Sequence, residues 1–141
     1  SPNYVRRSHI SVKDSIALIR DVGGVAVWSH PAIHFRQDYD GLEQWLGQMI
    51  GWGIQGLEVF NPSQSEDDAE FLQGLCSTYK LLYTAGSDFH EQGQHVADST
   101  TGLHSARHLG DYETYGFAVD AIMPHLDEAM RIARNSLPEK L

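Results

Sequence analysis

The stretch from Gly23 to Pro31, GGVAVWSHP, is the most informative part of this sequence for the fold. Its centre, Val25 to Trp28, is a short unbroken apolar run between a glycine pair and a His-Pro pair. Such a run is typical of a strand that is buried on both faces, as in a parallel sheet. The preceding residues, Ser11 to Val22, have helical apolar spacing, a serine that can cap the helix and an acidic first turn. We therefore expect a helix followed by a buried strand.

The alternation of helix and strand continues along the chain. The expected elements are helices over 41–52, from Ser65 and over 126–135, and strands over 57–60, 81–85 and 117–123. The first strands then begin near residues 25, 57 and 81, and units of about 30 residues are typical of βαβ repeats. Residues 91–115 show no clear period. The sequence predicts a single α/β domain over residues 1–141, with parallel strands alternating with helices.

Composition and charge limit the function classes. The 141 residues are 41% hydrophobic, with 10 basic and 19 acidic side chains and a net charge of −9. Such a chain does not bind nucleic acid through an overall positive electrostatic potential. A bound divalent cation can still create a local site for phosphate. No apolar run approaches the ~18 residues of a membrane helix. The single cysteine, Cys76, excludes an internal disulfide, fits a reducing cytoplasm and is expected in the core.

Chemically active side chains occur where the expected strands end, which is where parallel α/β folds place their functional groups. His30 follows the first strand, Glu58 and Asn61 belong to the second, and Asp88 and His90 follow the third. Asp88 and His90 are two residues apart, so an extended backbone points both to the same side. Imidazole and carboxylate together suit Zn²⁺, Mn²⁺ or Fe²⁺, and the eight histidines of the chain agree with metal chemistry. Taken singly, His30 and the pair Asp88 and His90 could also be hydrogen-bonded groups in turns. Glu58 could be a carboxylate that is hydrogen-bonded inside the fold.

Three segments resemble the PHP-domain (polymerase and histidinol phosphatase) phosphoesterases: GGVAVWSHP at 23–31, LEV at 57–59 and GSDFH at 86–90. Their spacing is similar as well, and the subgroup that looks most similar is TrpH/YciV-like, which acts on nucleotide and RNA 5′ phosphates. The resemblance covers roughly residues 4–92. It implies a distorted (β/α)7 barrel that holds up to three divalent metal ions, whose shared hydroxide attacks phosphorus.

Carried over by position, the resemblance implies metal ligands at His30, Asp88 and His90, with Asp88 and His90 as the catalytic residues. Asn61 and Arg36 are the candidate substrate-binding residues. The arginine that often follows the His-Pro pair in the family is absent at that spacing, and Arg36 lies a little further on. Its planar guanidinium could clamp a phosphate, or it could be a solvated surface group.

Part of the family pattern is missing from this sequence. The amino-terminal His-x-His pair, the first aspartate and the bridging glutamate of the family have no counterpart here. The chain is therefore expected to be the carboxyl-terminal part of a PHP domain. Alone it is expected to lack activity, and to associate with itself or with the amino-terminal segment.

The resemblance implies a cytoplasmic, metal-dependent hydrolase of phosphate esters in nucleotides or short nucleic acids. Two alternatives stay open. The chain could be a non-catalytic PHP remnant that serves as a binding or assembly module. It could also be a metal-dependent amidohydrolase, because such ligand sets do not determine which bond is cleaved.

The other histidines give weaker signals. His104 and His108 are four residues apart and would share a face only on a helix, but their segment has no helical apolar stripe. The histidines without a partner at a diagnostic spacing are His9, His34, His95 and His125.

Overall fold

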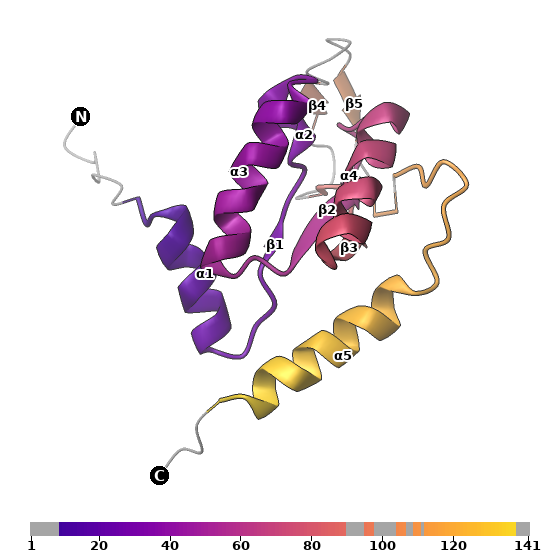
Figure 1. The fold of residues 1–141 in the computed structure, drawn as a ribbon. Coiled ribbons are helices and arrows are strands. Elements are labelled where there is room, and N and C mark those ends of the chain that lie inside the picture. The colour runs from indigo at the N-terminus through magenta and orange to yellow at the C-terminus, as the bar shows by residue number, and fades with distance from the viewer. Residues whose placement is uncertain (1–8, 90–94, 98–103, 107–108, 111, 138–141) are drawn as a thin grey trace, which may run out of the picture.

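The computed structural model of the chain describes residues 9–89, 95–97, 104–106, 109–110 and 112–137. A parallel sheet with the strand order β1-β2-β3 lies at the centre of the fold (Figure 1). Its strands are β1 (Val27–Trp28), β2 (Gly56–Phe60) and β3 (Leu82–Ala85). Both neighbouring pairs run parallel, which confirms the expected α/β architecture. Within the described residues the sheet has three strands, so the full (β/α)7 barrel is not shown.

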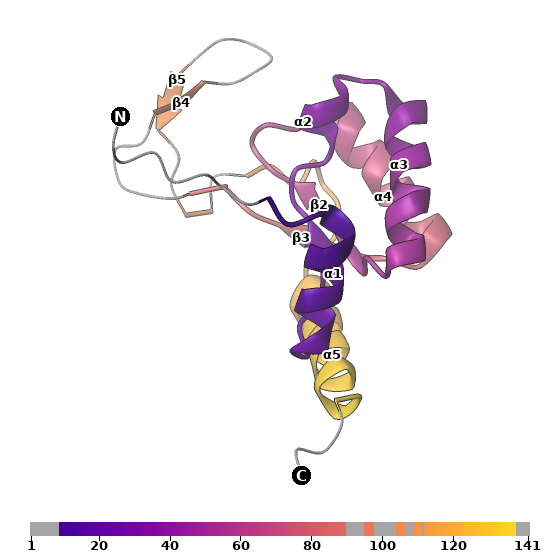
Figure 2. The same ribbon diagram turned by 90° about the vertical axis from the view of Figure 1, so that its left-hand side faces the viewer.

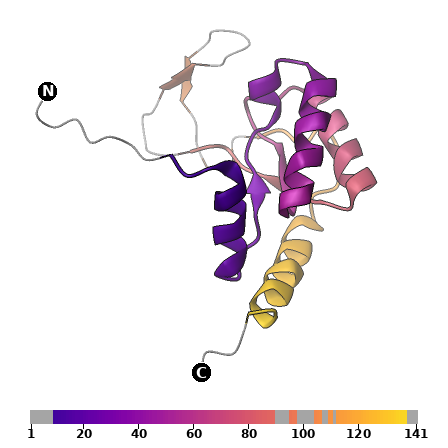
Figure 3. The same cartoon turned by 60° about the vertical axis from the view of Figure 1, so that its left-hand side comes forward.

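Helices surround this sheet. They are α1 (Val12–Asp21), α2 (Ala32–Phe35), α3 (Tyr39–Trp52), α4 (Glu66–Tyr79) and α5 (Ile122–Asn135). Helices α3 and α4 lie together on one side of the sheet (Figure 2). The strands β4 (His95–Ala97) and β5 (His104–Ala106) pair as an antiparallel hairpin that stands apart from the sheet (Figure 3). This hairpin falls in the region for which the sequence predicted no regular element.

Serine side chains begin two of the helices, as the sequence predicted. The Ser11 hydroxyl accepts a hydrogen bond from the Asp14 N–H at 3.0 Å and caps α1. The Ser65 hydroxyl accepts one from the Asp68 N–H at 3.2 Å, and the Asp68 carboxylate accepts one from the Ser65 N–H at 2.9 Å. This reciprocal pair satisfies two backbone donors at the start of α4. The cap therefore fixes where α4 begins after β2.

The hydrophobic core lies between the sheet and its neighbouring helices. Leu57 and Phe60 of β2 are fully buried, as expected for a central strand. Leu42 and Leu46 of α3 are also fully buried, so this helix packs one apolar face against the core. Only the middle position of β2, Glu58, is partly exposed. The tightly packed central strand thus carries one acidic side chain.

Residues 117–123 do not form a fourth strand, so that prediction was wrong. The chain turns before Ile122, where α5 already begins. A short apolar run looks alike in a buried strand and in a helix turn, so its pattern could not separate the two. Phe117 packs against Phe60, with ring centroids 5.9 Å apart. Pro124 lies in the first turn of α5, where a missing N–H costs no helical hydrogen bond.

Cys76 is buried on α4, and burial raises the pKa of its thiol to about 12. A thiol of this kind is an inert core group, as the sequence predicted. None of the helices in the described part of the chain has both the length and the apolar character that crossing a bilayer requires.

Candidate functional site

His30 lies in a tight turn directly after β1. Its φ of 35° is in the left-handed region that residues other than glycine seldom adopt. The His30 N–H donates a hydrogen bond to Glu58 Oε2 at 2.8 Å. Pro31, which follows, is fully buried and begins α2. The fold thus holds a strained turn at the carboxyl edge of the parallel sheet, where functional groups of such folds gather.

Glu58 joins the ends of the three parallel strands. Its Oε2 accepts the His30 N–H and also a hydrogen bond from Asn61 Nδ2 at 3.0 Å. A Cβ atom at Gly86 would lie 2.5 Å from Glu58 Oε1, so a larger residue after β3 would force the carboxylate to shift. Burial raises the pKa of Glu58, and the nearby Asp88 charge adds to this, while the hydrogen bonds from His30 and Asn61 oppose it. Glu58 is therefore a partly buried carboxylate whose hydrogen-bond partners come from the ends of β1 and β2.

Asp88 follows β3 on the same edge. Its φ of 54° is left-handed, a conformation that aspartate and asparagine tolerate better than most residues. Its carboxylate is close enough to Glu58 to raise the pKa of that residue. The structure therefore brings His30, Glu58 and Asp88 to one sheet edge. His90, the remaining expected ligand, lies outside the described residues.

The side-chain nitrogen and oxygen atoms at this sheet edge are of the types that coordinate divalent cations. His30 Nδ1 is buried and has no hydrogen-bond partner among the described residues, which is uncommon for a buried polar atom. Imidazole nitrogen and carboxylate oxygen are common ligands of Zn²⁺, Mn²⁺ and Fe²⁺. Within the ranges that the structure describes, no three His, Cys, Asp or Glu side chains form a metal-binding group. Metal binding by His30, Asp88 and His90 therefore stays a prediction.

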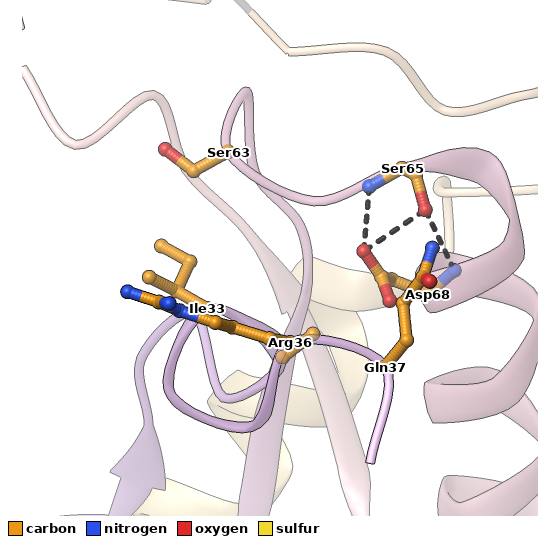
Figure 4. Close-up of a pocket in the computed structure, with 7 residues that line it drawn as sticks. Ile33, Arg36, Gln37, Ser63, Ser65 and Asp68 are labelled. Atoms are coloured by element: carbon orange, nitrogen blue, oxygen red, sulfur yellow. Dashed lines mark hydrogen bonds between the residues drawn. The ribbon is translucent and has the colours of Figure 1, made fainter. Parts of the chain in front are cut away.

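A cavity of about 380 Å³ lies between α2 and the start of α4 (Figure 4). Its polar lining includes Arg36, Gln37, Ser63 and Asp68. Arg36 and Gln37 both have left-handed backbones, with φ of 47° and 69°, and such strain gathers at binding sites. The Tyr39 hydroxyl donates to Asp68 at 2.8 Å, and burial together with this bond raises the pKa of Tyr39 to about 12. The Arg36 guanidinium forms no ion pair with a described residue, so the cavity has a cation for an anionic group.

Asn61 connects this cavity to the strand ends. It is buried, its Oδ1 accepts the Ser63 N–H at 3.0 Å, and its Nδ2 donates to Glu58 at 3.0 Å. Ser63 lines the cavity, and Glu58 holds the His30 turn, so the cavity adjoins the candidate metal edge. Both polar atoms of the Asn61 side chain have partners inside the fold. Its expected role in substrate binding stays a prediction that would use the second Nδ2 hydrogen.

His34 is a candidate that the sequence analysis did not select. Its ring lies 5.8 Å from the His30 ring, centroid to centroid, and its side chain is exposed. The only sequence signal is the four-residue separation of the two histidines. His104 lies on β5, so the chain does not present it on a helix with His108, which falls outside the described residues. Elsewhere, His95 lies on β4, and His9 and His125 are exposed.

Several curated proteins that act on phosphate esters are similar to this chain. It is 31% identical over 93 residues to a 3′,5′-nucleoside bisphosphate phosphatase of Chromobacterium violaceum, in a match that covers 66% of this chain and 32% of that protein. A phosphoribosyl 1,2-cyclic phosphate 1,2-diphosphodiesterase of Eggerthella lenta is 29% identical over 82 residues. This match covers 58% of the present chain and 29% of that protein. A 5′-3′ exoribonuclease of Haemophilus influenzae is 26% identical over 91 residues. This match covers 62% of the present chain and 31% of the exoribonuclease. The chain spans about a third of the length of these relatives.

Two solved structures share the fold. One is named as a metal-dependent phosphoesterase from Bifidobacterium adolescentis and has a TM-score of 0.64 at 24% sequence identity. The match covers 92% of this chain and 40% of the phosphoesterase chain. The other is an amidohydrolase from Chromobacterium violaceum, with a TM-score of 0.61 at 25% sequence identity. The match covers 92% of this chain and 42% of the amidohydrolase chain. No family model matches the chain. Together the relatives and the structures support a PHP-like phosphoesterase family, without indicating a subgroup.

Proposed function

We propose that this chain is part of a metal-dependent phosphoesterase of the PHP type, which hydrolyses phosphate esters of nucleotides or short nucleic acids. The observation that carries the proposal is the meeting of His30, Glu58 and Asp88 at the carboxyl edge of the parallel sheet. The names of the curated relatives support it, because each describes a hydrolase of phosphate esters.

In this proposal His30, Asp88 and His90 hold a divalent cation such as Mn²⁺, Zn²⁺ or Fe²⁺. When bound, such a cation lowers the pKa of a water molecule and stabilises charge on phosphoryl oxygens. Asp88 contributes negative charge near Glu58, at the same sheet edge as His30. Glu58 accepts the His30 N–H through Oε2, so it fixes the backbone of one proposed ligand.

The cavity beside α2 is proposed to receive the anionic part of the substrate, with Arg36 as its cation and with Asn61 hydrogen-bonded to Ser63 of its lining. In the protein that also carries the proposed amino-terminal segment, we expect Arg36→Ala to raise KM about 10-fold with little change in kcat. The reason is that the contact binds substrate and transition state alike. Arg36→Lys keeps the positive charge but lacks the planar guanidinium, so its KM should lie between those of the parent and Arg36→Ala. Arg134→Ala, on the exposed surface of α5, is the matched control. Steady-state kinetics in which Arg36→Ala keeps the KM of the parent would exclude this contact.

We further propose that residues 1–141 are the carboxyl-terminal part of a PHP domain. We use the term complete domain for this chain extended by the amino-terminal segment that the proposal requires. The share of the relatives that the chain spans supports this, as do exposed apolar side chains on and before α1, including Ile10 and Leu18. The amino-terminal segment would then supply the missing ligands, and pairing with it or self-association would cover this apolar surface. The chain alone should accordingly show negligible activity.

Hydrolysis of amide bonds is the second candidate, and the amidohydrolase among the structural neighbours favours it. A panel of phosphoesters and amides, offered to the complete domain with Mn²⁺, separates the two. The proposal requires cleavage of phosphoesters. Cleavage of amides alone would favour the second candidate, and cleavage of neither would favour a non-catalytic binding module.

A further inference from the structure

Gln64 is a buried amide that connects the segments carrying His30 and Glu58. Only 3% of its surface is exposed. Its Nε2 donates hydrogen bonds to the backbone carbonyl oxygens of Glu58 and Val59, at 3.1 and 2.8 Å. Its Oε1 accepts the N–H of Ala32 at 3.1 Å. The two ends of this side chain thus join the carboxyl end of β2 to the start of α2.

The turn from His30 to Ala32 depends on side-chain acceptors. Pro31 has no N–H, and the N–H groups on either side of it bond to side chains: His30 to Glu58 Oε2, and Ala32 to Gln64 Oε1. A backbone donor that loses its partner in a buried turn is costly. Because His30 also has a strained φ of 35°, its conformation persists only if the surroundings hold it.

We propose that Gln64 is a positioning residue that holds the His30 turn in its metal-binding conformation. This rests on the proposed function, because it takes His30 as a ligand. Gln64 supports the turn directly through Ala32, and it also fixes the backbone of Glu58, whose carboxylate holds the His30 N–H. The Tyr115 hydroxyl donates to the Gln64 carbonyl oxygen at 3.1 Å and holds this backbone in turn. Groups that orient a ligand beforehand strengthen metal binding.

Gln64→Met tests this role, because methionine has a similar size but lacks the amide donor and acceptor. Gln55→Met is a matched control, since Gln55 Oε1 accepts the Ala26 N–H at 3.2 Å before β1, at the opposite end of the sheet. Calorimetric titration of the chain with Mn²⁺ should show about 10-fold weaker binding for Gln64→Met and unchanged binding for Gln55→Met.

Amide hydrogen exchange in the metal-free protein gives a second readout. The amides of His30 and Ala32 should exchange roughly 10-fold faster in Gln64→Met than in Gln55→Met, because only the first variant opens this turn. Equal Mn²⁺ affinities of these two variants, or equal exchange of both amides, would overturn the positioning role. If the unsubstituted chain binds no Mn²⁺, the proposed metal site fails, and the exchange rates alone decide whether Gln64 holds the turn.

Discussion

Replacing Asp88 by asparagine in the complete domain is expected to lower kcat for phosphoester hydrolysis by about 10²-fold or more. The variant keeps the size of the side chain, and asparagine accepts the left-handed φ of 54° at this position. It removes the carboxylate charge beside Glu58 that is proposed to help hold the metal. Because no packing is lost, the free energy of unfolding should change by about 1 kcal/mol or less.

Rates at saturating Mn²⁺, combined with urea unfolding, separate a catalytic effect from a loss of stability. Asp127→Asn, on the exposed surface of α5, is the matched control and should retain full turnover. If Asp88→Asn also retained full turnover at saturating metal, Asp88 would be a structural residue.

The double variant His30→Ala/His90→Ala is expected to lose most of the metal that the chain retains after dialysis against Mn²⁺ or Zn²⁺. Both imidazoles of the proposed ligand set are removed, and one carboxylate alone binds these ions weakly. Elemental analysis of the dialysed protein measures the effect. Affinity should be modest even before substitution, because three protein ligands at most leave the site open.

The control removes two other histidines, so that the effect of the ligand positions is separated from the number of histidines in the chain. His9→Ala/His125→Ala alters exposed imidazoles outside the site and should leave the metal content unchanged. Equal metal content in His30→Ala/His90→Ala and the unsubstituted chain would contradict the ligand assignment.

Much of the fold around the site could be predicted because its signals are local. The apolar run before His30 identified β1, and Ser65 marked the start of α4. Helix α2 could not be predicted in this way, because the four residues over 32–35 are too few to show a period. The wrong strand at 117–123 has the same origin, since a short apolar run fits a strand and a helix turn equally well.

The site was predictable where topology alone brings residues together. The rule that parallel strands present their carboxyl ends at one edge brought His30 and Asp88 together, and the structure places both there. Gln64 could not be found, because its bond to Ala32 joins residues 32 positions apart and follows no motif. Asn61 was expected to face the substrate, but its partners within the fold emerge only from the three-dimensional contacts.

Release of phosphate from a 5′-phosphorylated nucleotide, measured against Mn²⁺ concentration in the complete domain, tests the proposed function most directly. We predict a rate that rises to saturation with Mn²⁺, disappears when a chelator removes the metal and falls about 10²-fold in Asp88→Asn. A rate that does not depend on Mn²⁺, or that Asp88→Asn leaves unchanged, would contradict a metal-dependent phosphoesterase site at the carboxyl edge of this sheet.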